Sequence, residues 1–250
     1  MKTGPSSLAL FAKPINEILE TVTNDKFDLI ELLSEGLYGP EHLLENKELL
    51  EPFYSYDLEY YIHSPNIDLN ISSLNEGIRR ESVRQIKRTL DLAEKINAKA
   101  ITVHPGHIGR IEDRIRNYAL ELATESIKEL MEYREGMETK LSIENMPNKP
   151  KFLGTRTEEL ENFVKETNCN ITIDIGHANT CDNTWEFLKV SNIAYYHLSD
   201  NNGVKDQHTI LGEGNLDLNL LKQVKIGVLE LNTYEKVLKS RDVLNTLNLL

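Results

Sequence analysis

Histidine and carboxylate side chains stand at the carboxyl-terminal ends of six consecutive apolar runs. These ends read YYIHSP, ITVHPG, LSIENMP, ITIDIGH, AYYHLSD with the loop KDQH after it, and GVLELN. The set consists of His63, His104, Glu144, Asp174, His177, His197, Asp206, His208 and Glu230. Imidazole nitrogens and carboxylate oxygens are the ligands that Zn²⁺ and Mn²⁺ take in proteins. The pattern therefore predicts a metal site.

Each of these residues also has a structural interpretation when it is taken alone. A single histidine at a strand end is more often a hydrogen-bonding residue, and a single carboxylate there is more often a helix cap. Asp206 and His208 could be a solvated loop. Independent structural roles, however, would not select the same end of six runs. Four crowded carboxylates need compensating charge, which one to three divalent cations per chain, Zn²⁺ or Mn²⁺, would supply.

The elements that must position this set are short apolar strands separated by amphipathic helices. Strands are predicted at 7–11, 27–33, 58–63, 98–104, 140–144, 170–175, 193–197 and 225–230. Near-continuous Ile, Leu and Val are typical of parallel strands that helices cover. Eight strand–helix units predict an α/β fold, a single (β/α)8 TIM barrel over residues 1–250, with the metal site at the C-terminal strand ends.

Composition narrows the possible partners. The 250 residues are 40% hydrophobic and 27% charged, a balance typical of globular proteins, and no run reaches the length of a membrane helix. The 28 Lys and Arg against 40 Asp and Glu give a net charge of −12, which disfavours nucleic acid as a partner.

Cys169 and Cys181 form no C-x-x-C pair, so a reducing cytoplasm is expected. The apolar stretch 8–11 is too short for a secretion signal, so we interpret it as the first strand.

The strand ends resemble, in order, those of one superfamily. HPG, IEN, DIGH, HLSD, D-Q-H with LGEGN, and LE match the superfamily that joins xylose-isomerase-like sugar isomerases and epimerases with endonuclease IV, the zinc-dependent abasic-site nuclease (AP endonuclease family 2). The resemblance runs from about His63 to the C-terminus. The motifs are specific together, and none is specific alone.

The two branches of the superfamily imply different metal sets. The resemblance to endonuclease IV implies three metals per chain. The first would be held by His63, His104 and Glu144, the second by Glu144, Asp174, His197 and Glu230, and the third by His177, Asp206 and His208. The isomerases imply one metal on the second of these sets. There His177 would contact substrate, and Glu144 and Glu230 would move the proton.

Both chemistries suit such residues. An isomerase needs a cation across a carbonyl and its neighbouring hydroxyl, with two carboxylates that remove and return a proton. A phosphodiesterase needs clustered cations that generate hydroxide and neutralise the leaving alkoxide. A clustered site explains His63, His104 and the Asp206–His208 pair more directly.

Other features favour the isomerase branch. The nuclease family opens with a G-x-H-x-S strand, whereas this chain has Gly4-Pro5-Ser6-Ser7 and no histidine before His42. Asn66 stands where the nucleases have a tyrosine that distorts DNA. The basic residues expected near the barrel mouth are few, namely Arg110, Arg156 and Lys205.

We therefore predict a metal-dependent isomerase or epimerase that acts on a sugar or sugar phosphate. The alternatives are a zinc phosphodiesterase of the endonuclease IV type, since LGEGN and the complete set of nine also fit it, and a barrel that binds metal and ligand without catalysis. Weaker predictions of substrate contact fall on His107, Arg110, Asn145 and Lys205. No membrane partner is expected, and the oligomeric state stays open.

Overall fold

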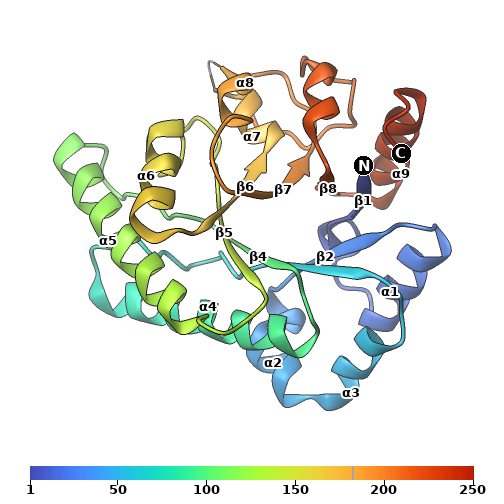
Figure 1. Cartoon of the computed structure of the whole chain (residues 1–250), viewed down its shortest axis with the longest axis horizontal. Coiled ribbons are helices and arrows are strands. Elements are labelled where there is room, and N and C mark those ends of the chain that lie inside the picture. The colour runs from blue at the N-terminus through green and yellow to red at the C-terminus, as the bar shows by residue number, and fades with distance from the viewer. Residues whose placement is uncertain (182) are drawn as a thin grey trace.

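Eight parallel strands surround a common axis, with helices between them, in the computed structural model, which describes residues 1–181 and 183–250 (Figure 1). Their hydrogen-bonded order is β1-β8-β7-β6-β5-β4-β3-β2. β1 and β2 meet at a seam, where Ser6 forms a parallel bridge with Glu31 and the Asp28 amide donates to the Thr3 carbonyl over 3.1 Å. The prediction of a TIM barrel is confirmed.

The strands are β1 (Lys2–Pro5), β2 (Leu29–Leu33), β3 (Glu59–His63), β4 (Ala100–Val103), β5 (Lys140–Glu144), β6 (Asn170–Asp174), β7 (Ile193–Leu198) and β8 (Ile226–Leu229). The predicted first strand at 7–11 is wrong. Ser7–Leu10 is a 3₁₀ helix, η1, and the Ser6 side chain accepts a hydrogen bond from the Leu8 amide at its start. The true β1 is the polar KTGP segment, which pairs with β8 and lacks the apolar pattern of a buried strand.

Helices fill the connections between the strands. They are α1 (Ile15–Asn24), α2 (Pro40–Glu45), α3 (Lys47–Leu50), α4 (Glu76–Lys95), α5 (Asp113–Tyr133), α6 (Thr157–Thr167), α7 (Ile175–Asn179), α8 (Thr184–Phe187) and α9 (Tyr234–Thr246), with 3₁₀ helices η2 (Gly36–Tyr38), η3 (Glu51–Tyr54) and η4 (Leu218–Gln223). The chain ends lie together (Figure 1), and the Met1 amino group donates to the Leu249 carbonyl over 2.7 Å. Within the described residues, no helix combines the length and apolarity that a membrane crossing requires.

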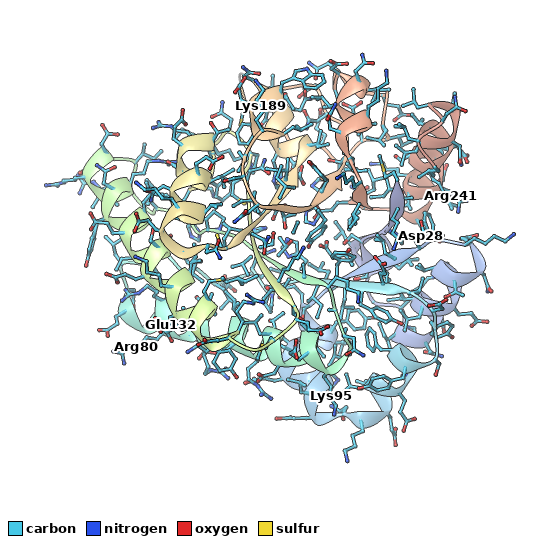
Figure 2. All side chains as sticks on the ribbon, in the orientation of Figure 1. Asp28, Arg80, Lys95, Glu132, Lys189 and Arg241 are labelled. Atoms are coloured by element: carbon cyan, nitrogen blue, oxygen red, sulfur yellow. The ribbon has the colours of Figure 1, made fainter. Side chains whose placement is uncertain are left out.

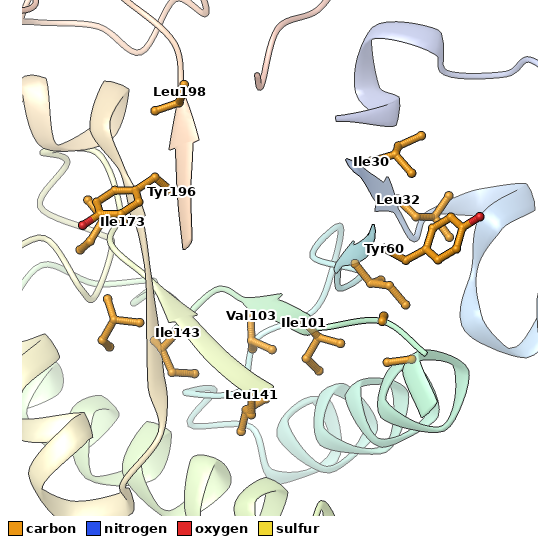
Figure 3. Close-up of a cluster of buried hydrophobic side chains, with 14 of the residues drawn as sticks. Ile30, Leu32, Tyr60, Ile101, Val103, Leu141, Ile143, Ile173, Tyr196 and Leu198 are labelled. Atoms are coloured by element: carbon orange, nitrogen blue, oxygen red, sulfur yellow. The ribbon is translucent and has the colours of Figure 1, made fainter. Parts of the chain in front are cut away.

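Side chains alternate between two faces along each strand, as the pleat requires. Ile101 and Val103 of β4 and Leu141 and Ile143 of β5 belong to the large buried cluster that includes helix residues (Figure 3). The residues between and beside them, such as Ala100, belong to the barrel interior, where a smaller cluster contains Leu29, Tyr61, Ala100, Tyr195 and Val228. This alternation also sets the direction of each polar strand-end residue.

Most charged side chains lie at the periphery, as the labelled Arg80, Glu132 and Lys189 do in Figure 2. Four charged or titratable side chains at or near the strand ends are instead buried: Glu31, Glu144, Asp174 and His197 are all at most 1% exposed.

Candidate metal centre

The strand register brings the predicted ligands to one end of the barrel. His63, Glu144 and Asp174 are the last residues of β3, β5 and β6, and His104 and Glu230 directly follow β4 and β8. Because all the strands are parallel, these positions share the C-terminal mouth, where barrel enzymes carry their active sites.

One group forms around His197. The ligand atoms of Glu144, Asp174, His197 and Glu230 all lie within 4.8 Å of one another. The Nδ1 atom of His197 lies 2.9 Å from Oε1 of Glu144, 3.1 Å from Oε2 of Glu230 and 3.9 Å from Oδ2 of Asp174. Three carboxylates and one imidazole thus converge on a volume of the size that a cation needs.

A second group shares Glu144 with the first. The ligand atoms of His63, His104 and Glu144 also lie within 4.8 Å of one another. The Nε2 atoms of His63 and His104 lie 3.4 Å and 3.0 Å from Oε2 of Glu144, whereas Oε1 faces His197. Each Glu144 oxygen therefore faces a different group, as in a carboxylate that bridges two cations.

The remaining three predicted ligands are joined through Asp206. Its Oδ2 atom lies 3.3 Å from Nε2 of His177 and 3.0 Å from Nε2 of His208. The Nδ1 atoms of the two rings lie 2.8 Å from the Asn145 carbonyl and 2.7 Å from the Glu230 carbonyl, respectively. These backbone contacts orient both Nε2 atoms toward Asp206.

The loop that carries Asp206 and His208 is held by Asp200 of the HLSD motif. Asp200 exchanges two backbone hydrogen bonds with Thr209, of 3.0 Å and 2.9 Å. Its buried carboxylate accepts from the amides of Gly212, Gly214 and Leu216. HLSD and LGEGN therefore act together as an anchor of this loop in the structure.

Unpaired oxygens show that the donor set fits a cation. Among the described residues, Oε2 of Glu144, Oδ2 of Asp174, Oδ1 of Asp206 and Oε2 of Glu230 are buried without a hydrogen bond of acceptable geometry. A buried unpaired carboxylate oxygen is costly. Divalent cations bound by these carboxylates and imidazoles would remove that cost.

The titration of the carboxylates reflects the same crowding. Burial raises the pKa of Asp174. The charge of His177 opposes this shift, but repulsion from Glu230 and Glu144 adds to it, and the pKa of Asp174 reaches about 7. Burial also acts to raise the pKa of Glu230, but the nearby charge of His197, whose Nδ1 atom lies 3.1 Å from Oε2, lowers it to about 2.

His63 and His208 carry compensating protons, whereas burial lowers the pKa of His104. Burial acts to lower the pKa of His63 and of His208. The approach of its Nε2 atom to the Glu144 carboxylate, together with nearby carboxylate charges, nevertheless raises the pKa of His63 to about 9. The bond to Asp206 and the charge of Glu230 raise the pKa of His208 to about 10. Metal binding would displace these protons, since a ligating imidazole is neutral.

One buried residue of the site was missed at the sequence level. Glu31 lies on β2 and is 0% exposed, and its Oε2 atom is 2.8 Å from Nε2 of His197 and 2.6 Å from the Tyr195 hydroxyl. The signal was a lone acid within the apolar run LIELL, which is costly to bury without a partner.

The weaker predictions of substrate contact gain little from the geometry. Arg110 is exposed and paired with Glu112 over 2.5 Å, and Lys205 is exposed in the loop before Asp206. Asn145 is fully buried and exchanges hydrogen bonds of 2.9 Å and 2.7 Å with the backbone of Asp174. His107 lines a cavity of about 250 Å³ that the candidate ligand His104 also lines.

Known proteins share this architecture. The model of the xylose isomerase-like TIM barrel family matches residues 20–233. An uncharacterized protein of Methanocaldococcus jannaschii is 34% identical over 90% of this chain and 80% of its own length. The crystal structure of a D-tagatose 3-epimerase-like protein is 31% identical and superposes with a TM-score of 0.86 over 98% of this chain and 96% of that one.

Endonuclease IV from Thermus thermophilus superposes with a TM-score of 0.79 over 99% of both chains, at 18% identity, which shows a common fold. The match to the family model spans most of the chain, and the strand order and the converging strand ends agree with it. This chain belongs to the xylose isomerase-like TIM barrel family.

Proposed function

We propose that this protein is a divalent-metal-dependent isomerase or epimerase of a sugar or sugar phosphate. The observation that carries the proposal is the group around His197, in which Glu144 and Glu230 approach the same nitrogen, at 2.9 Å and 3.1 Å. The similarity to a D-tagatose 3-epimerase-like protein supports it.

A divalent cation on this group would polarise a substrate carbonyl and the hydroxyl beside it. Glu144 and Glu230 reach the group from β5 and from the end of β8, so a substrate held there would have a carboxylate on each side. One takes the proton from the carbon beside the carbonyl, and the other returns it. His177, whose Nε2 atom faces Asp206, contacts a substrate hydroxyl.

The direct test is proton exchange. We expect metal-loaded protein, incubated with a panel of ketoses and their phosphates in heavy water, to place deuterium beside the carbonyl of the true substrate. Glu144→Gln and Glu230→Gln should each lower the exchange rate by about 10²–10⁴-fold, the usual contribution of a positioned acid or base. Glu158→Gln, on the exposed surface of α6, is the matched control and should leave the rate unchanged.

Tight ligand binding without exchange or turnover over the whole panel would contradict this proposal and indicate a binding protein instead. Calorimetry on the same panel measures that binding.

A second candidate function is phosphodiester hydrolysis, which the shared carboxylate of Glu144 favours. Its two oxygens face two separate groups, and a third group surrounds Asp206. Cleavage of an abasic-site oligonucleotide, with no ketose exchange and close to three metals per chain by elemental analysis, would establish this alternative. Close to one metal per chain is the expectation for the isomerase.

A further inference from the structure

We infer that Glu31 is a positioning residue that directs Nδ1 of His197 toward the metal. The inference rests on the proposed metal centre and adds a residue that is outside the predicted ligand set. Glu31 sits on β2, which β1 and β8 separate from β7, and its carboxylate approaches Nε2 of His197, whereas Glu144 and Glu230 approach Nδ1.

The two nitrogens of His197 have separate partners. Nε2 lies 2.8 Å from Oε2 of Glu31, and Nδ1 lies 2.9 Å from Oε1 of Glu144. A neutral imidazole carries one proton, and the hydrogen bond of one nitrogen decides which nitrogen can ligate. With the proton on Nε2 and donated to Glu31, the lone pair of Nδ1 points into the group of carboxylates. A carboxylate behind a histidine ligand fixes both its tautomer and its ring orientation in this way.

Glu31 is itself held in place by the barrel interior. The Tyr195 hydroxyl donates to the same Oε2 atom over 2.6 Å, and it also hydrogen-bonds to Thr102. The Tyr195 ring packs against that of Tyr61, with centroids 4.6 Å apart. These contacts lie directly beneath the strand ends and restrict the Glu31 carboxylate to the position that meets His197.

Structural stability alone does not account for this carboxylate. Glu31 is 0% exposed, and its other oxygen, Oε1, has no hydrogen-bond partner among the described residues. A buried acid with one unpaired oxygen is less favourable than an apolar side chain of similar size. The contact with His197 gives the residue a function that offsets this cost.

The experiment compares metal binding by wild-type protein, Glu31→Leu, Glu31→Gln and Tyr195→Phe. Dissociation constants for Zn²⁺ come from chelator competition, and the visible spectrum of Co²⁺-loaded protein reports the ligand geometry. Glu31→Leu removes the acceptor at similar volume and should weaken Zn²⁺ binding by about 10–100-fold with an altered Co²⁺ spectrum. Glu31→Gln keeps one acceptor oxygen and should restore part of the affinity.

Tyr195→Phe removes one contact that restricts the Glu31 carboxylate but leaves both hydrogen bonds of His197 in place, so it should weaken Zn²⁺ binding less than Glu31→Leu does. Glu158→Gln, on the exposed surface of α6, is the control and should leave both the affinity and the Co²⁺ spectrum unchanged. Glu31 variants with wild-type affinity and spectrum would overturn the inference while the proposed function stands. Absence of divalent-metal binding by the wild-type protein would overturn both.

Discussion

At the scale of single residues, the site is a balance between carboxylates and protonated imidazoles. Glu144 and Asp174 are at most 1% exposed, and Glu230 lies beside them. Without a cation, protons on His63, His177, His197 and His208 offset the carboxylate charge. The bond to Asp206 and the charge of Glu230 raise the pKa of His208 to about 10. Protons and metal therefore compete for the same atoms.

This competition predicts how stability depends on pH. Because the folded pKa of His208 is about 10 and the ordinary value is 6.5, the folded state holds a proton that the unfolded chain releases. The stabilisation is complete below pH 6.5 and is lost as the pH rises toward 10. We expect the urea midpoint of metal-free protein to fall across this range, and to fall less in His208→Gln. A midpoint that rises with pH in the wild-type protein would contradict the assignment.

At the scale of elements, α5 and α6 are joined by a buried ion pair next to the segment that follows β5. The Arg116 guanidinium donates to both oxygens of Glu159 over 2.7 Å and 2.8 Å, and to the carbonyls of Pro150 and Phe152. The Gly154 amide donates to Glu159 over 2.8 Å. The pair thus holds the chain segment just beyond Glu144.

Breaking this pair should be costly. The two side chains are only 10% and 8% exposed, so Arg116→Ala would leave a buried carboxylate without the guanidinium that neutralises it. We expect a loss of about 3–5 kcal/mol in the free energy of unfolding, measured by urea denaturation. The double variant Arg116→Met, Glu159→Leu removes both charges and should recover most of that loss. A double variant as unstable as Arg116→Ala would show that the charge left behind is not the cause.

At the scale of the whole molecule, the barrel closes where β1 passes β2, and Glu31 belongs to that seam. Gly4 allows the close approach, because a Cβ atom at this position would lie 1.7 Å from the Leu29 carbonyl oxygen. The backbone on both sides is fixed by pairing, of β1 with β8 and of β2 with β3. The position of Glu31 therefore depends on a glycine of β1 that packs against Leu29, two residues before Glu31 on β2.

Gly4→Ala should force the seam apart. We expect a loss of about 3 kcal/mol, the upper part of the range for overpacked interiors, together with weaker Zn²⁺ binding because Glu31 moves with β2. Urea denaturation and chelator competition measure the two effects. Gly109→Ala is the control, since nothing lies within 4 Å of its added Cβ. Equal stability of the two variants would show that the seam tolerates a side chain.

The sequence by itself determined the barrel and the gathering of its polar strand ends. Near-continuously apolar strands joined by helices indicate a parallel barrel, whose strands all end at one mouth, which is why His63, Glu144 and Asp174 could be named together. The polar β1 was missed because its burial comes from neighbours on β8 and β2, which no local pattern records.

Only the tertiary structure decided how those residues are grouped and oriented. The rotation of the Glu144 side chain decides that its two oxygens face different groups. The contact between Glu31 and His197 joins residues that are 166 positions apart in the sequence. Alternation along one strand specifies a face but not the partner across the barrel. The partner is set by closure of the sheet at the seam, which leaves only β1 and β8 between β2 and β7, so that both strands face one packed interior.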